Sequence, residues 1–231
     1  MYKTYTIGEM ARILGITAET IRYYERKNII RPVHNEESGY RYYTTWDLHM
    51  IIRARCYLGF GFTIEQTAEI LQKENIGEID DILSEQEQKI QQQIIYQMNV
   101  LKKLRMNRSL MKDSREQPRQ LTIQMSPAIY RINTQVNYDL ILSKEEQREI
   151  RQMCEKVPFV FSTALFRKED IEAGKTDFDF GIGIEEQFAS LLQVRQTERV
   201  QYCPSQLCIY MSVSSRSGQL HIMFFSLHLI I

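Results

Sequence analysis

The chain begins with two short helices whose starts and ends are specified by its sequence between residues 6 and 26. Thr6 and Glu9 form a capping box, in which each side chain satisfies a backbone N–H group of the other residue. Gly15 ends this helix, and Thr17 caps the next one. Two helices joined by so short a turn predict a helix-turn-helix unit, whose second helix can enter the major groove of DNA.

Apolar residues recur on one face of each predicted helix. They are Ile7, Met10, Ala11 and Leu14 in the first helix, and Ile21, Tyr24 and Ile29 in and after the second. The outward residues of the second helix are then Thr20, Arg22, Tyr23 and Arg26. We expect Arg22 to reach a base edge or a phosphate and Tyr23 a phosphate, with a solvated face as the alternative. Thr17 and Thr20 could donate to phosphate, although capping explains Thr17 equally well.

A basic, aromatic hairpin is predicted after the second helix. Arg31-Pro32 breaks the helical pattern, and Ser38-Gly39 separates two short segments. The second segment ends in Tyr40, Arg41, Tyr42 and Tyr43. We expect a two-stranded wing in which Arg41 contacts the DNA backbone or minor groove with Tyr40 and Tyr42 beside it, while Tyr43 fills the core.

Two further helices are expected before residue 75. Thr44 or Thr45 can cap the first, which carries Leu48, Ile51, Ile52 and Leu58 and is stopped by Gly59 and Gly61. Thr63 and Gln66 form a capping box for the second, which ends before a loop around Asn75-Ile76-Gly77.

Taken in order, the helix, the turn, the string IRYYER, the proline-ended exit and GYRYY followed by Thr44, Thr45 and Asp47 resemble the winged-helix head of the MerR family. The resemblance covers roughly the first seventy residues. It implies a dimeric transcription regulator that binds double-stranded promoter DNA and acts on RNA polymerase indirectly. In that family, effector binding makes the dimer bend and untwist a promoter whose spacer is too long.

A long helix from residue 83 onward has apolar residues alternating four and three positions apart. They are Leu83, Ile90, Ile94, Leu101, Leu104 and Met111, with Glu87, Gln97 and Arg108 as polar interruptions. Such a stripe must pack on another surface, which is either a partner helix or the chain's own C-terminal domain. The spacing favours a partner helix, and the resemblance implies an antiparallel coiled coil with a second subunit.

A polar stretch from Asp113 to Gln120 leads into a domain in which predicted strands predominate over helices. Predicted strands cover 121–125, 129–136, 159–166, 178–184, 199–202 and 207–213, and Ser143 with Glu146 caps a helix toward Cys154. This α+β domain loosely resembles the GyrI-like effector domain of multidrug-sensing MerR relatives. The predicted organisation is multi-domain: an all-α winged helix-turn-helix domain (1–75), a linker and dimerisation helix (76–119) and an α+β effector domain (120–231).

A pocket for a small, lipophilic or aromatic effector would need aromatic walls, and a carboxylate if the ligand is a cation. The candidate residues are Phe161, Phe166, Phe180, Tyr210 and Glu185. For the aromatic residues, the alternating pattern favours core packing of the sheet, and for Glu185 a solvated turn or helix start is the alternative.

The chain finishes in the apolar run LHIMFFSLHLII, where a complete domain of this type would continue with a helix and returning strands. The run is expected to be either one buried strand or the remnant of a shortened reading frame. If it is exposed, it is an aggregation hazard. The alternative function is therefore a DNA-binding regulator whose truncated sensor does not respond to ligand.

Composition narrows the remaining function classes. No apolar run approaches the ~20 residues needed to cross a bilayer, and the N-terminus lacks a signal-peptide core, so a cytoplasmic protein with no membrane partner is expected. Residues 1–60 carry nine Lys or Arg and six Asp or Glu, although the whole chain has zero net charge. The four cysteines have no zinc-site spacing, and no catalytic cluster is found, so we expect no cofactor, no metal and no enzyme. A small-molecule hydrolase remains the remote alternative.

Overall fold

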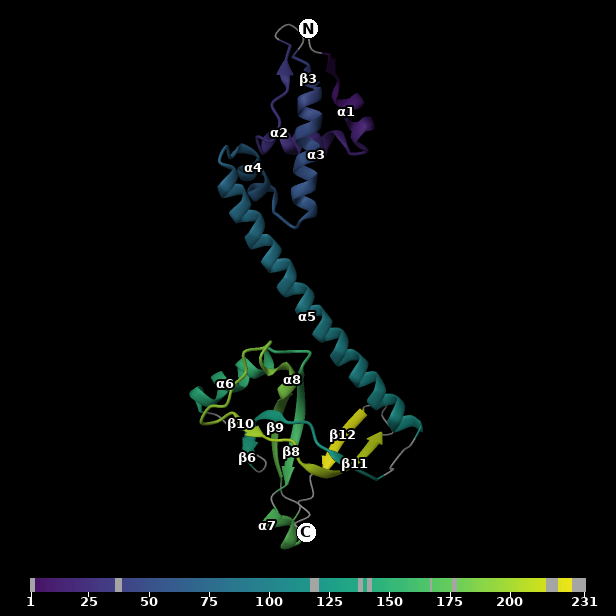
Figure 1. The fold of residues 1–231 in the computed structure, drawn as a ribbon, viewed down its shortest axis with the longest axis vertical. Helices are drawn as coiled ribbons and strands as arrows, with labels where there is room; N and C mark the ends of the chain where they lie inside the picture. Colours follow the sequence, from purple (N-terminus) through teal and green to yellow (C-terminus); the bar gives the residue numbers. More distant parts are fainter. Residues whose placement is uncertain are drawn as a thin grey trace. The chain divides into compact units, whose positions relative to one another are not determined.

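The computed structural model describes residues 3–35, 39–116, 121–136, 139–140, 143–166, 168–175, 178–214 and 220–225 (Figure 1). It forms two compact units, Met1–Gln93 and Ile94–Ile231, and helix α5 (Ile76–Glu116) contributes residues to both. The predicted domain boundaries at residues 75 and 119 stay predictions.

The N-terminal unit, called here the head, contains four short helices. They are α1 (Ile7–Leu14), α2 (Ala18–Arg26), α3 (Thr45–Gly59) and α4 (Ile64–Gln72). Each begins after a threonine N-cap, namely Thr6, Thr17, Thr44 and Thr63. Gly15 ends α1 in the left-handed conformation at φ 63°, which glycine adopts without steric cost. The predicted helix starts and the end of α1 are confirmed.

The core of the head gathers one face of each of the first three helices. Its most buried members include Met10, Ile21, Tyr43 and Ile51, all fully inaccessible to solvent. The predicted apolar faces of α1 and α2 pack in this core, and Tyr43 has the core-filling role. The prediction for Ile52 of α3 is wrong, because its side chain is 42% exposed. Burial raises the pKa of the Tyr43 hydroxyl.

The hairpin of the head is part of a three-stranded sheet. Strand β2 (Val33–His34) pairs antiparallel with β3 (Arg41–Thr44), and β1 (Thr4–Tyr5) pairs with the other edge of β3. The expectation of only two strands was incomplete, because the two residues before the Thr6 cap are extended and add to the sheet. Ser38 of the predicted turn lies outside the described residues.

Removing the first capping box is expected to destabilise the head. Thr6 N donates to Glu9 Oε2 over 2.8 Å, and Glu9 N donates back to Thr6 Oγ1 over 3.3 Å. Thr6→Ala is therefore expected to lower the free energy of unfolding by about 1 kcal/mol, measured by urea denaturation. Thr4→Ala, in the neighbouring strand, is the control, and an equal loss in that variant would contradict the capping explanation.

The same box predicts a pH dependence. Hydrogen bonds from Thr6, first from its backbone, hold the pKa of Glu9 below its usual 4.5. A carboxylate with a lowered folded-state pKa stabilises the protein above its unfolded-state pKa and loses that effect as the pH falls through the folded-state value. Glu9→Gln is therefore expected to unfold with a weaker dependence on pH below about 4.5, in urea midpoints measured from pH 6 to 3.

Helix α5 is longer than predicted at both ends. The expected loop around Asn75-Ile76-Gly77 covers residues 73–75 instead. Ile76 and Gly77 already belong to the helix, and Gly77 N donates to Asn75 Oδ1 over 2.9 Å. At the other end the helix continues to Glu116, so the first residues of the polar stretch from Asp113 are helical. Residues 117–120 lie outside the described part.

The C-terminal unit is built around a four-stranded antiparallel sheet. It consists of β5 (Ile129–Asn133), β8 (Val160–Phe166), β9 (Phe178–Glu185) and β10 (Gln201–Cys203), in the order β10-β5-β9-β8. The predicted strand 129–136 is interrupted at Thr134, whose N–H donates to Phe180 O over 2.9 Å. Helix α6 (Lys144–Cys154) begins at the predicted Ser143 cap. Ile132, Ile184, Phe159 and Phe188 form the core of this unit.

Smaller elements complete the C-terminal unit. A second sheet contains β4 (Thr122–Met125), β11 (Leu207–Ser214) and β12 (Leu220–Phe225), and β6 (Gln135–Val136) pairs with β7 (Asp139–Leu140). The short helix α7 (Lys168–Glu172) was not predicted, whereas α8 (Glu186–Ala189) begins after its N-cap Glu185, in agreement with the alternative of a helix start there. Strand β12 covers the first half of the final apolar run, and 226–231 lie outside the described residues.

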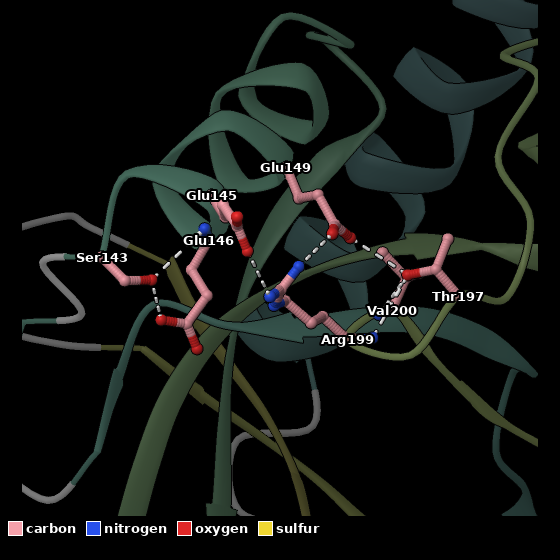
Figure 2. Close-up of polar contacts among 7 residues, drawn as sticks. All are labelled: Ser143, Glu145, Glu146, Glu149, Thr197, Arg199 and Val200. Carbon is pink, nitrogen blue, oxygen red and sulfur yellow. Dashed lines mark hydrogen bonds and ion pairs between the residues drawn. The ribbon is translucent and has the colours of Figure 1, made fainter.

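An arginine ties the segment before β10 to helix α6. Figure 2 shows Arg199 between Glu145 and Glu149, with nitrogen–oxygen distances of 3.2 and 2.9 Å. Thr197 Oγ1 also donates to Glu149, over 3.0 Å. These contacts raise the pKa of Arg199, chiefly through the hydrogen bond to Glu149. They explain why this irregular segment is held against the helix.

Candidate nucleic-acid interface

The outward face of α2 carries the side chains that the sequence predicted for DNA contact. Arg22, Tyr23 and Arg26 are exposed on consecutive turns. Thr20 is half-buried, and its hydroxyl lies 2.8 Å from that of the N-cap residue Thr17. Thr17 therefore caps the helix, which was the alternative to a phosphate contact. The side chains of Arg22, Tyr23 and Arg26 remain accessible for phosphate or base contact.

Glu19 holds the two arginines of α2 in place. Its carboxylate accepts from Arg26 Nη2 over 2.9 Å and from Arg22 Nη1 over 3.3 Å. These bonds, first the one from Arg26, lower the pKa of Glu19. The guanidinium groups are thus ordered along one face, but their charge is partly balanced by a neighbouring acid.

A second acid, Glu25, connects α2 to the hairpin. Arg41 Nε donates to Glu25 Oε1 over 3.1 Å, and His34 Nε2 lies 3.9 Å from the same oxygen. Tyr40, at the end of the hairpin, is 70% exposed, whereas Tyr42 is half-buried. The predicted wing residues are therefore brought beside α2, and Arg41 is positioned by an ion pair rather than by packing.

Three further residues of the head were not singled out by the sequence. Lys27 Nζ, at the end of α2, lies 2.7 Å from Glu65 of α4, and Arg55 donates to Leu14 O over 3.0 Å. Trp46, the only tryptophan of the chain, is 65% exposed at the start of α3. The partners of Lys27 and Arg55 are distant in sequence, so no local pattern could have revealed them.

The predicted dimerisation residues lie on an accessible face of α5. Leu83 is half-buried, whereas Ile90, Ile94, Leu101, Leu104 and Met111 are between 36% and 55% exposed. Another face of the same helix packs on the core of the C-terminal unit through Tyr96, Val100 and Met106. Helix α5 therefore does pack on the chain's own C-terminal unit, which was the alternative to a partner helix. It does so through residues other than those of the predicted stripe.

The effector candidates are only partly brought together. Phe180 is 42% exposed and packs edge-to-face on Phe178, with ring centroids 4.7 Å apart. Phe161 is half-buried, and Glu185 is buried in an ion pair with Lys103. The side chains of Phe166 and Tyr210 lie outside the described part. A hollow of about 340 Å³ is lined instead by Ala189, Ser190, Gln193, Val194 and Arg195.

Metal-binding groups and membrane-spanning helices are both absent from the described residues. No group of three His, Cys, Asp or Glu side chains there is placed to hold a metal ion. In the same residues, no helix is both long and apolar enough to span a membrane. Cys56, Cys154, Cys203 and Cys208 are free thiols, and burial raises the pKa of Cys208.

Comparison with known sequences identifies the head. Residues 5–74 match the family described as MerR HTH family regulatory protein. The MerR-type region thus coincides with the four short helices and the three-stranded sheet, which confirms the resemblance seen in IRYYER and GYRYY.

Curated relatives match the chain over a little more than a quarter of its length. The uncharacterised HTH-type transcriptional regulator PA4778 of Pseudomonas aeruginosa is 38% identical over 65 residues, covering 28% of this chain and 49% of that protein. The HTH-type transcriptional regulator AdhR of Bacillus subtilis is 40% identical over 63 residues, covering 27% and 45%. The chain spans about half the length of the curated relatives it matches.

Among solved structures, the EcmrR–DNA complex determined by cryo-electron microscopy is similar at 20% identity. The alignment covers 90% of this chain and 78% of that one, with a TM-score of 0.41.

Proposed function

We propose that the chain is a dimeric, sequence-specific DNA-binding transcription regulator of the MerR type. The observation that carries the proposal is the outward basic face of α2, where Arg22, Tyr23 and Arg26 are exposed and Arg41 is held beside them by Glu25. A helix of this kind can enter the major groove while the hairpin contacts the backbone. RNA polymerase would be affected indirectly, through the deformation of promoter DNA.

The proposed dimer is supported by the exposed stripe on α5. Leu101, Leu104 and Met111 are about half exposed although they are large and apolar. A helix face of this composition is stabilised when a second helix covers it, as in a coiled coil. We therefore propose that a second copy of the chain packs on this stripe.

The effector is proposed to be a small, lipophilic or aromatic molecule bound by the C-terminal unit. The support is limited to the aromatic residues on β8 and β9, of which Phe161 and Phe180 remain accessible. A regulator whose sensor does not respond to ligand is the competing proposal. A ligand-induced change in DNA affinity would exclude it.

The test of DNA binding is a fluorescence-anisotropy titration of the full chain on its own promoter DNA, with a shuffled duplex as competitor. Specific binding is expected, with an association constant whose logarithm falls linearly with the logarithm of the salt concentration. The reason is that cationic contacts to phosphate release counterions. Equal affinity for the shuffled duplex, or no binding by folded protein, would overturn the proposal.

Charged substitutions on the exposed stripe are expected to produce monomers. Leu101→Glu combined with Leu104→Glu places two carboxylates in the proposed apolar interface, where their desolvation opposes association. Sedimentation velocity should then show a shift from dimer to monomer. Ile95→Glu is the matched control, because Ile95 is also about half exposed but lies off the stripe. A dimer that survives the double substitution would rule out this interface.

A further inference from the structure

Helix α5 carries large apolar side chains on two different faces. The inner face, which packs on the C-terminal unit, consists of Tyr96, Val100 and Met106. The outer stripe consists of Ile94, Leu101, Leu104 and Met111. At about 3.6 residues per turn, the centres of the two faces lie about a third of a turn apart, and Val100 is the inner residue that borders the outer stripe. Hydrophobicity alone therefore does not determine which face packs on the sheet.

A single buried charge lies in the middle of the inner face. Lys103 is 7% exposed, and its Nζ donates to Glu185 Oε1 over 2.6 Å. The same nitrogen lies 5.2 Å from the ring centroid of Phe161 and 5.9 Å from that of Phe188. The ammonium group is thus surrounded by its counter-ion and two aromatic rings, which favour a cation.

Glu185 is equally removed from solvent. It ends β9, is 7% exposed, and its second oxygen accepts from Gln187 Nε2 over 2.5 Å. Each member of the pair is therefore compensated only while the other is present. A buried charge that loses its partner is strongly unfavourable.

Rotation of α5 would break this compensation. If the outer stripe packed on the sheet, Lys103 would move to solvent, and an apolar side chain such as Leu101 or Leu104 would face Glu185. The carboxylate would then remain buried without a counter-ion. The unpaired charge therefore disfavours packing through the outer stripe, although that stripe offers apolar side chains of the same kind as the inner face.

We propose that the Lys103–Glu185 pair is a register lock, which selects the inner face of α5 for packing and keeps the outer stripe outward for a second copy of the chain. Buried polar pairs are best attested in this role, fixing register at little net gain in stability. The proposal rests on the proposed function only for the use of the outer stripe. The choice of face is a property of one chain.

The test uses the full chain with the exposed Cys56 and Cys154 replaced by serine and with Met106→Cys on the inner face, at the position of that face farthest from the outer stripe. The rate of alkylation at position 106 by iodoacetamide, followed by peptide mass spectrometry, reports whether that face is covered. Lys103→Met combined with Glu185→Leu is expected to raise the rate at least tenfold while the urea midpoint stays close to that of the parent.

A matched control is available on the same helix. Lys112 and Glu116 form an exposed pair, with a nitrogen–oxygen distance of 4.0 Å. The corresponding Lys112→Met and Glu116→Leu double variant is expected to leave the alkylation rate at position 106 unchanged.

An unchanged rate in the folded Lys103→Met, Glu185→Leu variant would overturn the register lock. Lys103→Met alone, which leaves Glu185 unpaired, must also raise the rate, and an unchanged rate there is equally decisive. If neither variant folds, the pair is a requirement for folding rather than a selector of the face, and the proposal is wrong. Because the measurement contains no DNA, a failure of the proposed DNA binding leaves it intact.

Discussion

Arg22→Ala is expected to weaken binding of the full chain to its promoter DNA by at least about tenfold. Arg22 is exposed on the outward face of α2, where a guanidinium can make a bidentate contact to guanine. Such a contact contributes ~1–3 kcal/mol of discrimination against the wrong base, and about 1.4 kcal/mol corresponds to a tenfold change in affinity. A dimer loses the contact in both subunits. Anisotropy titrations on the promoter and on a shuffled duplex measure both affinity and specificity.

The matched control for this prediction is Arg151→Ala. Arg151 is exposed on α6 of the C-terminal unit, so its removal changes the net charge of the chain equally. An equal loss of affinity in both variants would show that bulk charge, not the face of α2, governs binding. Arg41→Ala is expected to weaken binding to both duplexes alike, because a hairpin contact to phosphate carries no sequence information.

The neighbouring acid gives an effect of opposite sign. Glu19 balances the charge of Arg22 and Arg26, at 3.3 and 2.9 Å. Glu19→Gln is therefore expected to raise the affinity for DNA by a few fold in the same titration at low salt, since one negative charge near the phosphates is removed. Weaker binding would indicate that the ordering of the two arginines matters more than their net charge.

Gly181→Ala is expected to lower the free energy of unfolding of the C-terminal unit by about 3 kcal/mol, the upper range for overpacking. A Cβ at this position of β9 would lie 2.4 Å from Ile132 O and 3.0 Å from Arg131 Nη2. The backbone carbonyl belongs to the paired strand β5 and cannot move without disturbing the ladder. Urea denaturation followed by circular dichroism measures the loss.

Gly183→Ala is the graded control in the same strand. Its Cβ would meet the ends of two side chains, Thr163 Cγ2 at 3.1 Å and Phe161 Cζ at 3.3 Å. These can give way by a few tenths of an ångström, so the expected loss is only about 1 kcal/mol. A larger loss at Gly183 than at Gly181 would show that the clash with the backbone is not the dominant cost.

The head was predictable because its determinants are local. Thr6 with Glu9 and Thr63 with Gln66 mark helix starts within three residues, and Gly15 marks an end. The third strand was missed because Thr4–Tyr5 is too short to show alternation. The predicted DNA-contact residues occupy the expected face of α2, but their acidic partners Glu19 and Glu25 follow only from the folded arrangement.

The C-terminal unit was less predictable because its decisive contacts join distant residues. From the sequence, Glu185 was assigned to a turn or a helix start. In the structure it is buried and paired with Lys103, which lies 82 positions earlier. Arg131 is similar: it donates to Thr163 Oγ1 and Asp179 O, over 2.9 and 2.8 Å, and burial lowers its pKa. Neither burial follows from residue type, since charged side chains are ordinarily exposed.

Helix α5 carries packing contacts on its inner face and an apolar stripe on its outer face. The number of residues in the helix is therefore constrained, because an insertion changes the direction in which every later side chain points. One inserted residue between Tyr96 and Met106 would turn everything beyond it by about 100°, so that neither face would stay continuous. An insertion of seven residues would nearly restore both. Natural variation in the length of this helix is therefore expected to occur in whole pairs of turns.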